Sequence, residues 1–182
     1  MMGLPGSPIL YYGDEIGMGD NVYLGDRNGV RTPMQWHSGV NAGFSTADPE
    51  RLWLPLISNA VWGYQAINVA SQERNATSLL NWMRRLIEVR RSTRAFGRGS
   101  IEFVKPDNHR VLAFTRTLNR ETILVVSNLA GTAQAVELDL SRLAGAIPIE
   151  MFGHSVFPRI SREPYVMMMG SFNFYWFRLR WL

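Results

Sequence analysis

The chain has 182 residues, enough for one ordinary domain or two small ones and too few for a complete eight-stranded parallel barrel of about 250 residues. Hydrophobic residues make up 46% and charged residues 19%, which excludes disordered and collagen-like classes. The net charge is +4 with scattered basic residues, and cysteine is absent, so we expect no nucleic-acid partner, no disulfide and no thiolate chemistry.

The first expected element is a short buried strand over Ile9–Tyr12. Four consecutive apolar residues follow the turn cluster Pro5–Pro8, a pattern typical of a parallel strand covered on both faces. Residues 17–77 then contain many Gly, Pro, Asn and Asp residues without periodicity. A connection of about 60 residues is unusually long, so it is expected to be functional or to contain short elements of its own.

One amphipathic helix is expected after residue 77, with Thr77 or Ser78 as its N-cap. Its apolar stripe has helical spacing and consists of Leu79, Trp82, Met83, Leu86 and Ile87. Gly97 and Gly99 are predicted to end it.

From Ser100 onward, short apolar runs alternate with turn residues. The expected strands are 101–105, 111–117, 122–128, 135–140, 147–152, 165–169 and 172–179. This spacing predicts an antiparallel β-sandwich.

Two sequence motifs carry the most information about function. Residues Gly3–Gly17 resemble the eighth barrel strand of the α-amylase superfamily of glycoside hydrolases, in which a proline-containing turn feeds a buried strand. Residues Asn28–Trp36 contain Arg-Thr-Pro-Met-Gln-Trp, which resembles the motif of the oligoglucosidase and trehalose synthase branch. Four further stretches resemble the trehalose synthases (maltose α-glucosyltransferases): Asn41–Ser45, Trp53–Pro55, Tyr64–Val69 and Phe174–Leu179.

The resemblance covers essentially the whole chain and implies its fold and activity. Residues 1–96 would be the carboxyl-terminal end of a catalytic (β/α)8 barrel, with its last strand, long loop and last helix. Residues 97–182 would be the carboxyl-terminal β-sandwich domain. The implied reaction interconverts maltose and trehalose by retaining intramolecular glucosyl transfer; a fragment of an oligo-1,6-glucosidase or α-glucosidase is the alternative.

No catalytic residue is assigned to this chain. Retaining transfer needs two carboxyl groups about 5 to 5.5 Å apart, and the resemblance implies that these acids lie on earlier barrel strands, before Met1. Asp14 and Glu15 are neighbours on the expected strand and would point to opposite faces. We therefore expect the chain, interpreted as a truncated product, to be inactive by itself.

Arg31 and Glu15 are the candidate substrate-binding residues. A guanidinium offers a planar fork of donors that can hold vicinal sugar hydroxyls, and the resemblance implies that Arg31 lines the pocket of the transferred glucosyl unit. Glu15 is expected at the carboxyl end of a barrel strand, where barrel active sites are built. The structural alternatives are a loop-fixing Arg31 and a Glu15 that binds loop backbone or an arginine.

The long loop contains five aromatic residues that could stack on sugars: Trp36, Phe44, Trp53, Trp62 and Tyr64. The favoured interpretation is that they form a small hydrophobic core within the loop itself. No histidine pair has ligand spacing, and a turn or cap role is favoured over calcium for Asp20, Asp26 and Asn28, so no metal or cofactor is expected.

No signal peptide or membrane span is expected, and a cytoplasmic location is predicted. Maltose and trehalose are the expected ligands of a complete enzyme. A maltokinase partner and self-association into a homo-oligomer are two further interactions that the sequence permits. A non-catalytic carbohydrate-binding or interaction role of the β-domain is a further alternative.

Overall fold

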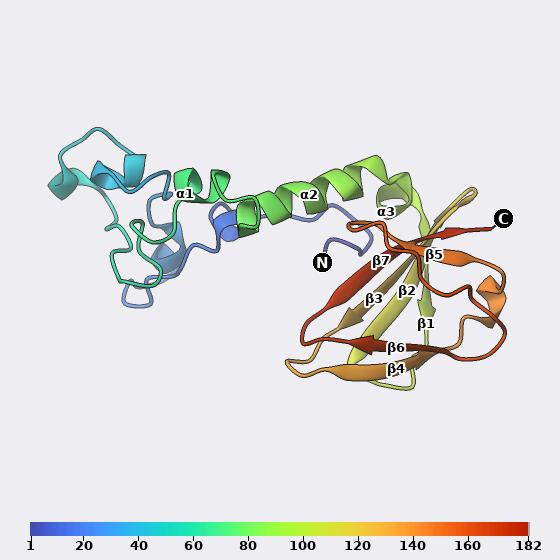
Figure 1. Ribbon diagram of the computed structural model, residues 1–182. Helices are drawn as coiled ribbons and strands as arrows, with labels where there is room; N and C mark the ends of the chain where they lie inside the picture. Colours follow the sequence, from blue (N-terminus) through green and yellow to red (C-terminus); the bar gives the residue numbers. More distant parts are fainter. Residues whose placement is uncertain (182) are drawn as a thin grey trace. The chain divides into compact units, whose positions relative to one another are not determined.

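The computed structural model describes residues 1–181 (Figure 1). It contains two compact units. The loop unit is Pro8–Ile87, and the sheet unit is Met1–Ser7 together with Glu88 and the residues that follow it. Within residues 1–181, no helix has both the length and the apolar character needed to cross a bilayer.

The loop unit is built from short helical elements, as its length suggested. It contains η1 (Asp14–Ile16), η2 (Asn28–Arg31), η3 (Val40–Gly43), η4 (Pro49–Arg51) and α1 (Val69–Glu73). Its small core joins Ile16, Met34 and Leu80. The core therefore forms between chain segments that are far apart in the sequence.

The strand expected over Ile9–Tyr12 is not formed, and this prediction is wrong for the described chain. Residues 8–11 have no regular structure, and Ile9 is 85% exposed. A strand needs backbone partners on neighbouring strands, and no described segment pairs with this run.

The predicted long helix is present as α2 (Leu79–Ser92). The Ser78 hydroxyl accepts a hydrogen bond from the Asn81 amide at 3.3 Å, which confirms Ser78 as the N-cap. The buried face differs from the expected stripe: Leu80 is buried, whereas Leu79 is 42% exposed. The helix also ends before Gly97, and a separate short helix, α3 (Arg94–Arg98), follows it.

The sheet unit confirms the antiparallel sandwich. Its strands are β1 (Ser100–Val104), β2 (Val111–Leu118), β3 (Glu121–Asn128), β4 (Gln134–Leu138), β5 (Ile147–Glu150), β6 (Tyr165–Met169) and β7 (Phe174–Arg180), with η5 (Ser141–Leu143) between β4 and β5. One sheet has the order β1-β2-β3-β7-β5 and the other pairs β4 with β6 (Figure 1). All pairings are antiparallel.

The main core lies between the two sheets. Alternate residues point inward, because side chains on a strand alternate between its two faces. The large sheet contributes Leu124 and Phe177, and the two-stranded sheet contributes Leu138, Met167 and Met169. Each of these side chains is at most 5% exposed.

The opposite face of the large sheet is covered by α3 and the segment Met1–Ser7. The Phe96 ring of α3 packs against Trp176, with ring centroids 4.4 Å apart. A Cβ atom at Gly3 would lie 3.4 Å from Phe114 and Val125, so the segment runs close over the sheet. The unit therefore has three layers: the two-stranded sheet, the large sheet and this cover.

Two arginines fix Met1–Ser7 onto the sheet unit through backbone carbonyls. Arg90 donates to the carbonyls of Met2, Leu4 and Gly6, the last two at 3.3 and 2.6 Å. Arg116 donates to the carbonyl of Gly3 at 3.3 Å. Burial lowers the pKa of both guanidinium groups, and for Arg116 the charge of Arg90 lowers it further.

Candidate functional site

The first candidate residue, Glu15, lies in a tight turn between two glycines. Gly13 has φ 95° and Gly17 has φ 67°, both left-handed, so the chain reverses around η1. Glu15 is half-buried, and its Oε2 accepts a hydrogen bond from the Gly13 amide at 2.9 Å. Asp14 Oδ2 likewise accepts from the Tyr11 amide at 3.0 Å. Both carboxylates therefore bind local backbone.

The second candidate residue, Arg31, ends η2 and is exposed. Its guanidinium forms no hydrogen bond or ion pair with any residue among 1–181. Its charge acts on Tyr12, whose hydroxyl donates to the Thr32 carbonyl at 2.9 Å. Burial raises the pKa of Tyr12 and the hydrogen bond with Tyr11 raises it further, while the positive charge of Arg31 opposes both. No residue among 1–181 therefore accepts a hydrogen bond from the guanidinium of Arg31.

A hollow of about 220 Å³ lies between the η1 turn and η2. It is lined by Tyr11, Tyr12, Gly13, Asp14, Met18, Gly19, Asp20 and Val30. These include the sequence neighbours of both candidates, Asp14 beside Glu15 and Val30 beside Arg31. No ion pair joins Glu15 to Arg31 in the described chain.

Two buried amides hold the polypeptide that follows Arg31, and no sequence pattern predicted a role for either. Gln35 is fully buried, and its Nε2 donates to the carbonyls of Ile67 at 2.5 Å and Trp62 at 3.2 Å. Asn41 Nδ2 donates to the carbonyls of Ser45 at 3.0 Å and Ala47 at 2.7 Å. One feature of the sequence could have indicated the role of Gln35: its amide side chain lies between two apolar residues of the motif, Met34 and Trp36.

Replacing Gln35 by leucine is expected to lower the free energy of unfolding by about 1 to 3 kcal/mol, because two carbonyls lose their donor inside the loop unit. Urea unfolding measures the change. The matched control is Gln65→Leu, which alters an exposed glutamine of the same unit. If Gln35→Leu lowers the free energy of unfolding no more than Gln65→Leu does, Gln35 does not stabilise the loop unit through these hydrogen bonds.

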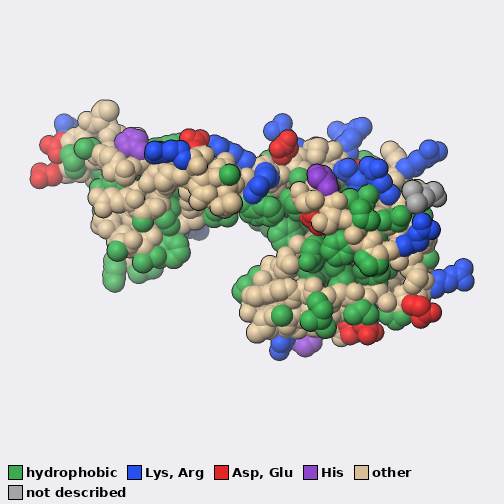
Figure 2. All heavy atoms as spheres, in the orientation of Figure 1, with side chains coloured by type: hydrophobic (Ala, Val, Ile, Leu, Met, Phe, Trp, Pro, Cys, Tyr) green, Lys and Arg blue, Asp and Glu red, His purple; other side chains and the backbone are tan. Residues whose placement is uncertain are grey.

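The loop aromatics do not form the core of the loop unit, so that prediction is wrong. Trp36, Phe44, Trp53 and Trp62 are 48%, 53%, 94% and 49% exposed. The core is made instead by Ile16, Met34 and Leu80. On the face drawn in Figure 2, hydrophobic side chains gather on the surface of this unit. Such surfaces are typical of contacts with other protein segments or ligands.

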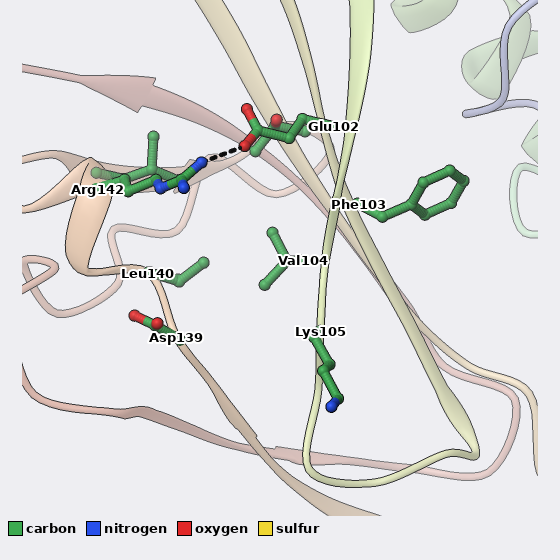
Figure 3. Close-up of a pocket in the computed structure, with 9 residues that line it drawn as sticks. Glu102, Phe103, Val104, Lys105, Asp139, Leu140 and Arg142 are labelled. Carbon is green, nitrogen blue, oxygen red and sulfur yellow. Dashed lines mark hydrogen bonds and ion pairs between the residues drawn. The ribbon is translucent and has the colours of Figure 1, made fainter.

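A hollow of about 280 Å³ in the sheet unit has one aromatic residue, Phe103, in its lining. It lies between β1 and η5, with the Glu102–Arg142 ion pair of 2.7 Å at its rim (Figure 3). In Figure 3 the Phe103 ring extends to the opposite side of β1 from Val104. Hydrogen bonds from Ser141 lower the pKa of Asp139. The Asp139 carboxylate therefore binds the turn that precedes η5.

No three or more His, Cys, Asp or Glu side chains lie close enough together to hold a metal ion in residues 1–181. Of the calcium candidates, Asp20 and Asp26 are exposed. Asp26 adopts a left-handed φ of 54°, as expected for a turn residue.

Sequence comparisons give the class of protein. Residues 1–99 match the family described as "Alpha amylase, catalytic domain", and residues 101–176 match "Maltogenic Amylase, C-terminal domain". Because the first match covers more than half of the chain, the chain belongs to the alpha-amylase family.

Individual relatives narrow the comparison within this family. The chain is 49% identical over 98% of its length to the trehalose synthase of Pimelobacter sp. (strain R48) and to the trehalose synthase/amylase TreS of Mycobacterium tuberculosis (strain ATCC 25618 / H37Rv). It covers 32% and 30% of these two proteins. The chain thus spans about a third of the length of the curated relatives it matches.

A solved structure with a similar fold is the trehalulose synthase MutB from Pseudomonas mesoacidophila MX-45. Its TM-score is 0.75 at 24% identity, with 98% of this chain and 36% of that chain covered. At this identity the likeness establishes the fold, which combines the end of an alpha-amylase catalytic domain with a carboxyl-terminal β-domain.

Proposed function

We propose that the chain is the carboxyl-terminal portion of a trehalose synthase-like enzyme that interconverts maltose and trehalose by retaining intramolecular glucosyl transfer. The observation that carries the proposal is the 49% identity to trehalose synthases over 98% of the chain. The exposed apolar surface of the loop unit supports it, because a complete barrel would cover that surface.

Within this proposal the chain supplies substrate contacts rather than the reacting carboxyl groups. Retaining transfer needs a carboxylate nucleophile and a carboxylic acid on either side of the glycosidic bond. Asp14 and Glu15 are each bound to local backbone, so they do not form such a pair. We assign Arg31, with its unoccupied donors, to the hydroxyls of the transferred glucosyl unit. We also assign Glu15 to the substrate site, beside its hydrogen bond with the Gly13 amide in the turn.

The domain boundary in this proposal lies between residues 96 and 97. Residues 1–96 form the end of the catalytic barrel and residues 97–182 the β-domain; the two family matches, which meet between residues 99 and 101, support this division. We further propose a cytoplasmic location, with which the absence of cysteine is compatible. A maltokinase partner of the β-domain is an alternative that co-elution with the purified chain would test.

The test is to incubate the purified chain with maltose and to follow trehalose and glucose. We expect no turnover by the chain alone, and trehalose formation by a longer protein that adds a complete barrel before Met1. Trehalose formation by the chain alone would overturn the assignment of the acids to other barrel strands. Hydrolysis of isomaltose by the longer protein, without trehalose formation, would favour the oligo-1,6-glucosidase alternative.

Calorimetric titration tests the remaining alternative, a β-domain that binds carbohydrate without catalysis. A β-domain that binds carbohydrate by itself would release or take up heat with maltose, trehalose or glycogen. We expect no heat from the chain, because Trp176 is buried and the hollow of the sheet unit has a single aromatic residue, Phe103, in its lining. Saturable heat with any of the three sugars would favour the carbohydrate-binding role.

A further inference from the structure

The residue after Arg31 is held inside the loop unit. Thr32 is fully buried, and its φ of −63° and ψ of 156° give the extended conformation that a following proline, Pro33, favours. The Thr32 hydroxyl oxygen is buried without a hydrogen-bond partner among residues 1–181. The carbonyl of Thr32, and not its side chain, is therefore the polar group that fixes this residue.

A tyrosine hydroxyl is the single donor to the Thr32 carbonyl within the described chain. Tyr12 Oη donates to it at 2.9 Å from 20 positions earlier in the sequence, and no backbone amide of residues 1–181 does so. Burial raises the pKa of Tyr12, and the hydrogen bond with Tyr11 raises it further. The phenol consequently keeps the proton that it donates well above neutral pH.

Tyr12 is itself carried by a turn whose backbone is fixed on both sides of it. The amide before it belongs to Tyr11 and donates to Asp14 Oδ2 at 3.0 Å. The amide after it belongs to Gly13 and donates to Glu15 Oε2 at 2.9 Å. The Tyr12 hydroxyl thereby connects two separate segments of the loop unit, this turn and the end of η2.

We propose that Tyr12 is a positioning residue for Arg31. Its hydroxyl acts through the Thr32 carbonyl and sets where the guanidinium meets the hydroxyls of the transferred glucosyl unit. The inference rests on the proposed function, in which Arg31 binds that unit. Because the Arg31 side chain has no hydrogen bond or ion pair within residues 1–181, its backbone determines its place. Hydrogen bonds to substrate depend on distance and direction, so a small displacement of this backbone weakens them.

The first test uses the chain itself, without sugar. Tyr12→Phe removes the hydroxyl and keeps the ring. By nuclear magnetic resonance we expect the carbonyl carbon of Thr32 to change its chemical shift and the backbone order parameters of Arg31 and Thr32 to fall. The matched control is Tyr23→Phe, at a tyrosine of the same unit that is 94% exposed, which should change neither quantity. If both quantities are also unchanged in Tyr12→Phe, the inference is overturned, whatever the substrate of the enzyme.

The second test is a double-mutant cycle in a longer protein that includes the complete barrel. Tyr12→Phe is expected to lower kcat/KM for maltose about tenfold, the effect of one lost hydrogen bond. In an Arg31→Ala background the same change should cost less than about twofold, because no guanidinium remains to be positioned. A hydroxyl that only stabilises the fold would cost the same in both backgrounds. Equal losses in the two backgrounds, or no loss with Arg31 present, would therefore overturn the inference.

The outcomes of this cycle separate the inference from the proposed function. A longer protein that hydrolyses isomaltose and forms no trehalose contradicts the proposed function, and the same cycle measured with isomaltose still tests Tyr12. A longer protein that forms trehalose, but in which Tyr12→Phe and Arg31→Ala act independently, supports the proposed function and contradicts the positioning role of Tyr12.

Discussion

Replacing Arg116 by alanine is expected to lower the free energy of unfolding by about 3 to 5 kcal/mol, because three backbone carbonyls lose their donor together. Arg116 is 1% exposed on β2. Its guanidinium donates to the carbonyls of Gly99 at 2.7 Å, Ser100 at 3.3 Å and Gly3 at 3.3 Å. No acid is within ion-pairing distance in the described chain, so three backbone carbonyls depend on this one side chain.

The physical reason is the cost of an unpaired carbonyl. Each buried acceptor that loses its donor costs about 1 to 3 kcal/mol of stability. The cost is smaller at the carbonyls of Ser100 and Gly99, because these are partly open to water and can accept a hydrogen bond from it. Arg116→Lys keeps the charge but replaces the planar fork by a single ammonium group that cannot reach all three carbonyls. We expect its loss to lie between those of wild type and alanine.

Urea unfolding followed by circular dichroism measures this effect. The control is Arg120→Ala, an exposed arginine in the turn between β2 and β3. An Arg116→Ala chain within about 0.5 kcal/mol of wild type would show that the carbonyls find other donors. If Arg116→Ala does not fold, the smaller loss of Arg116→Lys still reports the same interaction.

Replacing Arg31 by alanine in a longer protein that includes the complete barrel is expected to lower kcat/KM for maltose about 100-fold, or roughly 2.7 kcal/mol of transition-state stabilisation. The proposed cause is the loss of the charged donors that hold the hydroxyls of the transferred glucosyl unit. The melting temperature is measured beside kcat/KM, because Arg31 forms no hydrogen bond or ion pair within residues 1–181 and only contacts with the added barrel would make its loss destabilising.

Arg27→Ala is the matched control, since Arg27 is exposed at the other end of η2. Its kcat/KM should stay within about twofold of wild type. An Arg31→Ala enzyme with full activity, or one that loses activity only because it melts earlier, would favour the loop-fixing alternative. The comparison therefore separates substrate contact from a structural role.

Local sequence patterns predicted the sheet unit well. Alternating apolar residues and turn residues placed all of its strands within a few residues of their observed bounds, because each strand pairs with another strand of the same chain. Ser78 was recognised as an N-cap from its position before an apolar helical repeat. The motif Arg31–Trp36, together with the stretch Gly3–Gly17, was sufficient to indicate the family.

Predictions failed where the outcome depends on distant partners. Ile9–Tyr12 has the composition of a buried strand, but a strand forms only when neighbouring strands supply hydrogen bonds. The aromatic side chains of the loop unit would suit a core, yet Trp53 is 94% exposed and the core joins Ile16, Met34 and Leu80 instead. Composition identifies an apolar residue but not the surface that covers it.

The sequence by itself determined the family, the antiparallel character of the carboxyl-terminal half and the candidate residues Glu15 and Arg31, because these depend on local pattern and motif. Only the tertiary structure decided that Arg116 and Gln35 hold distant carbonyls. These features depend on which backbone groups remain unpaired after folding. Which groups remain unpaired is set by contacts between residues up to 113 positions apart in the sequence, and no local pattern encodes such contacts.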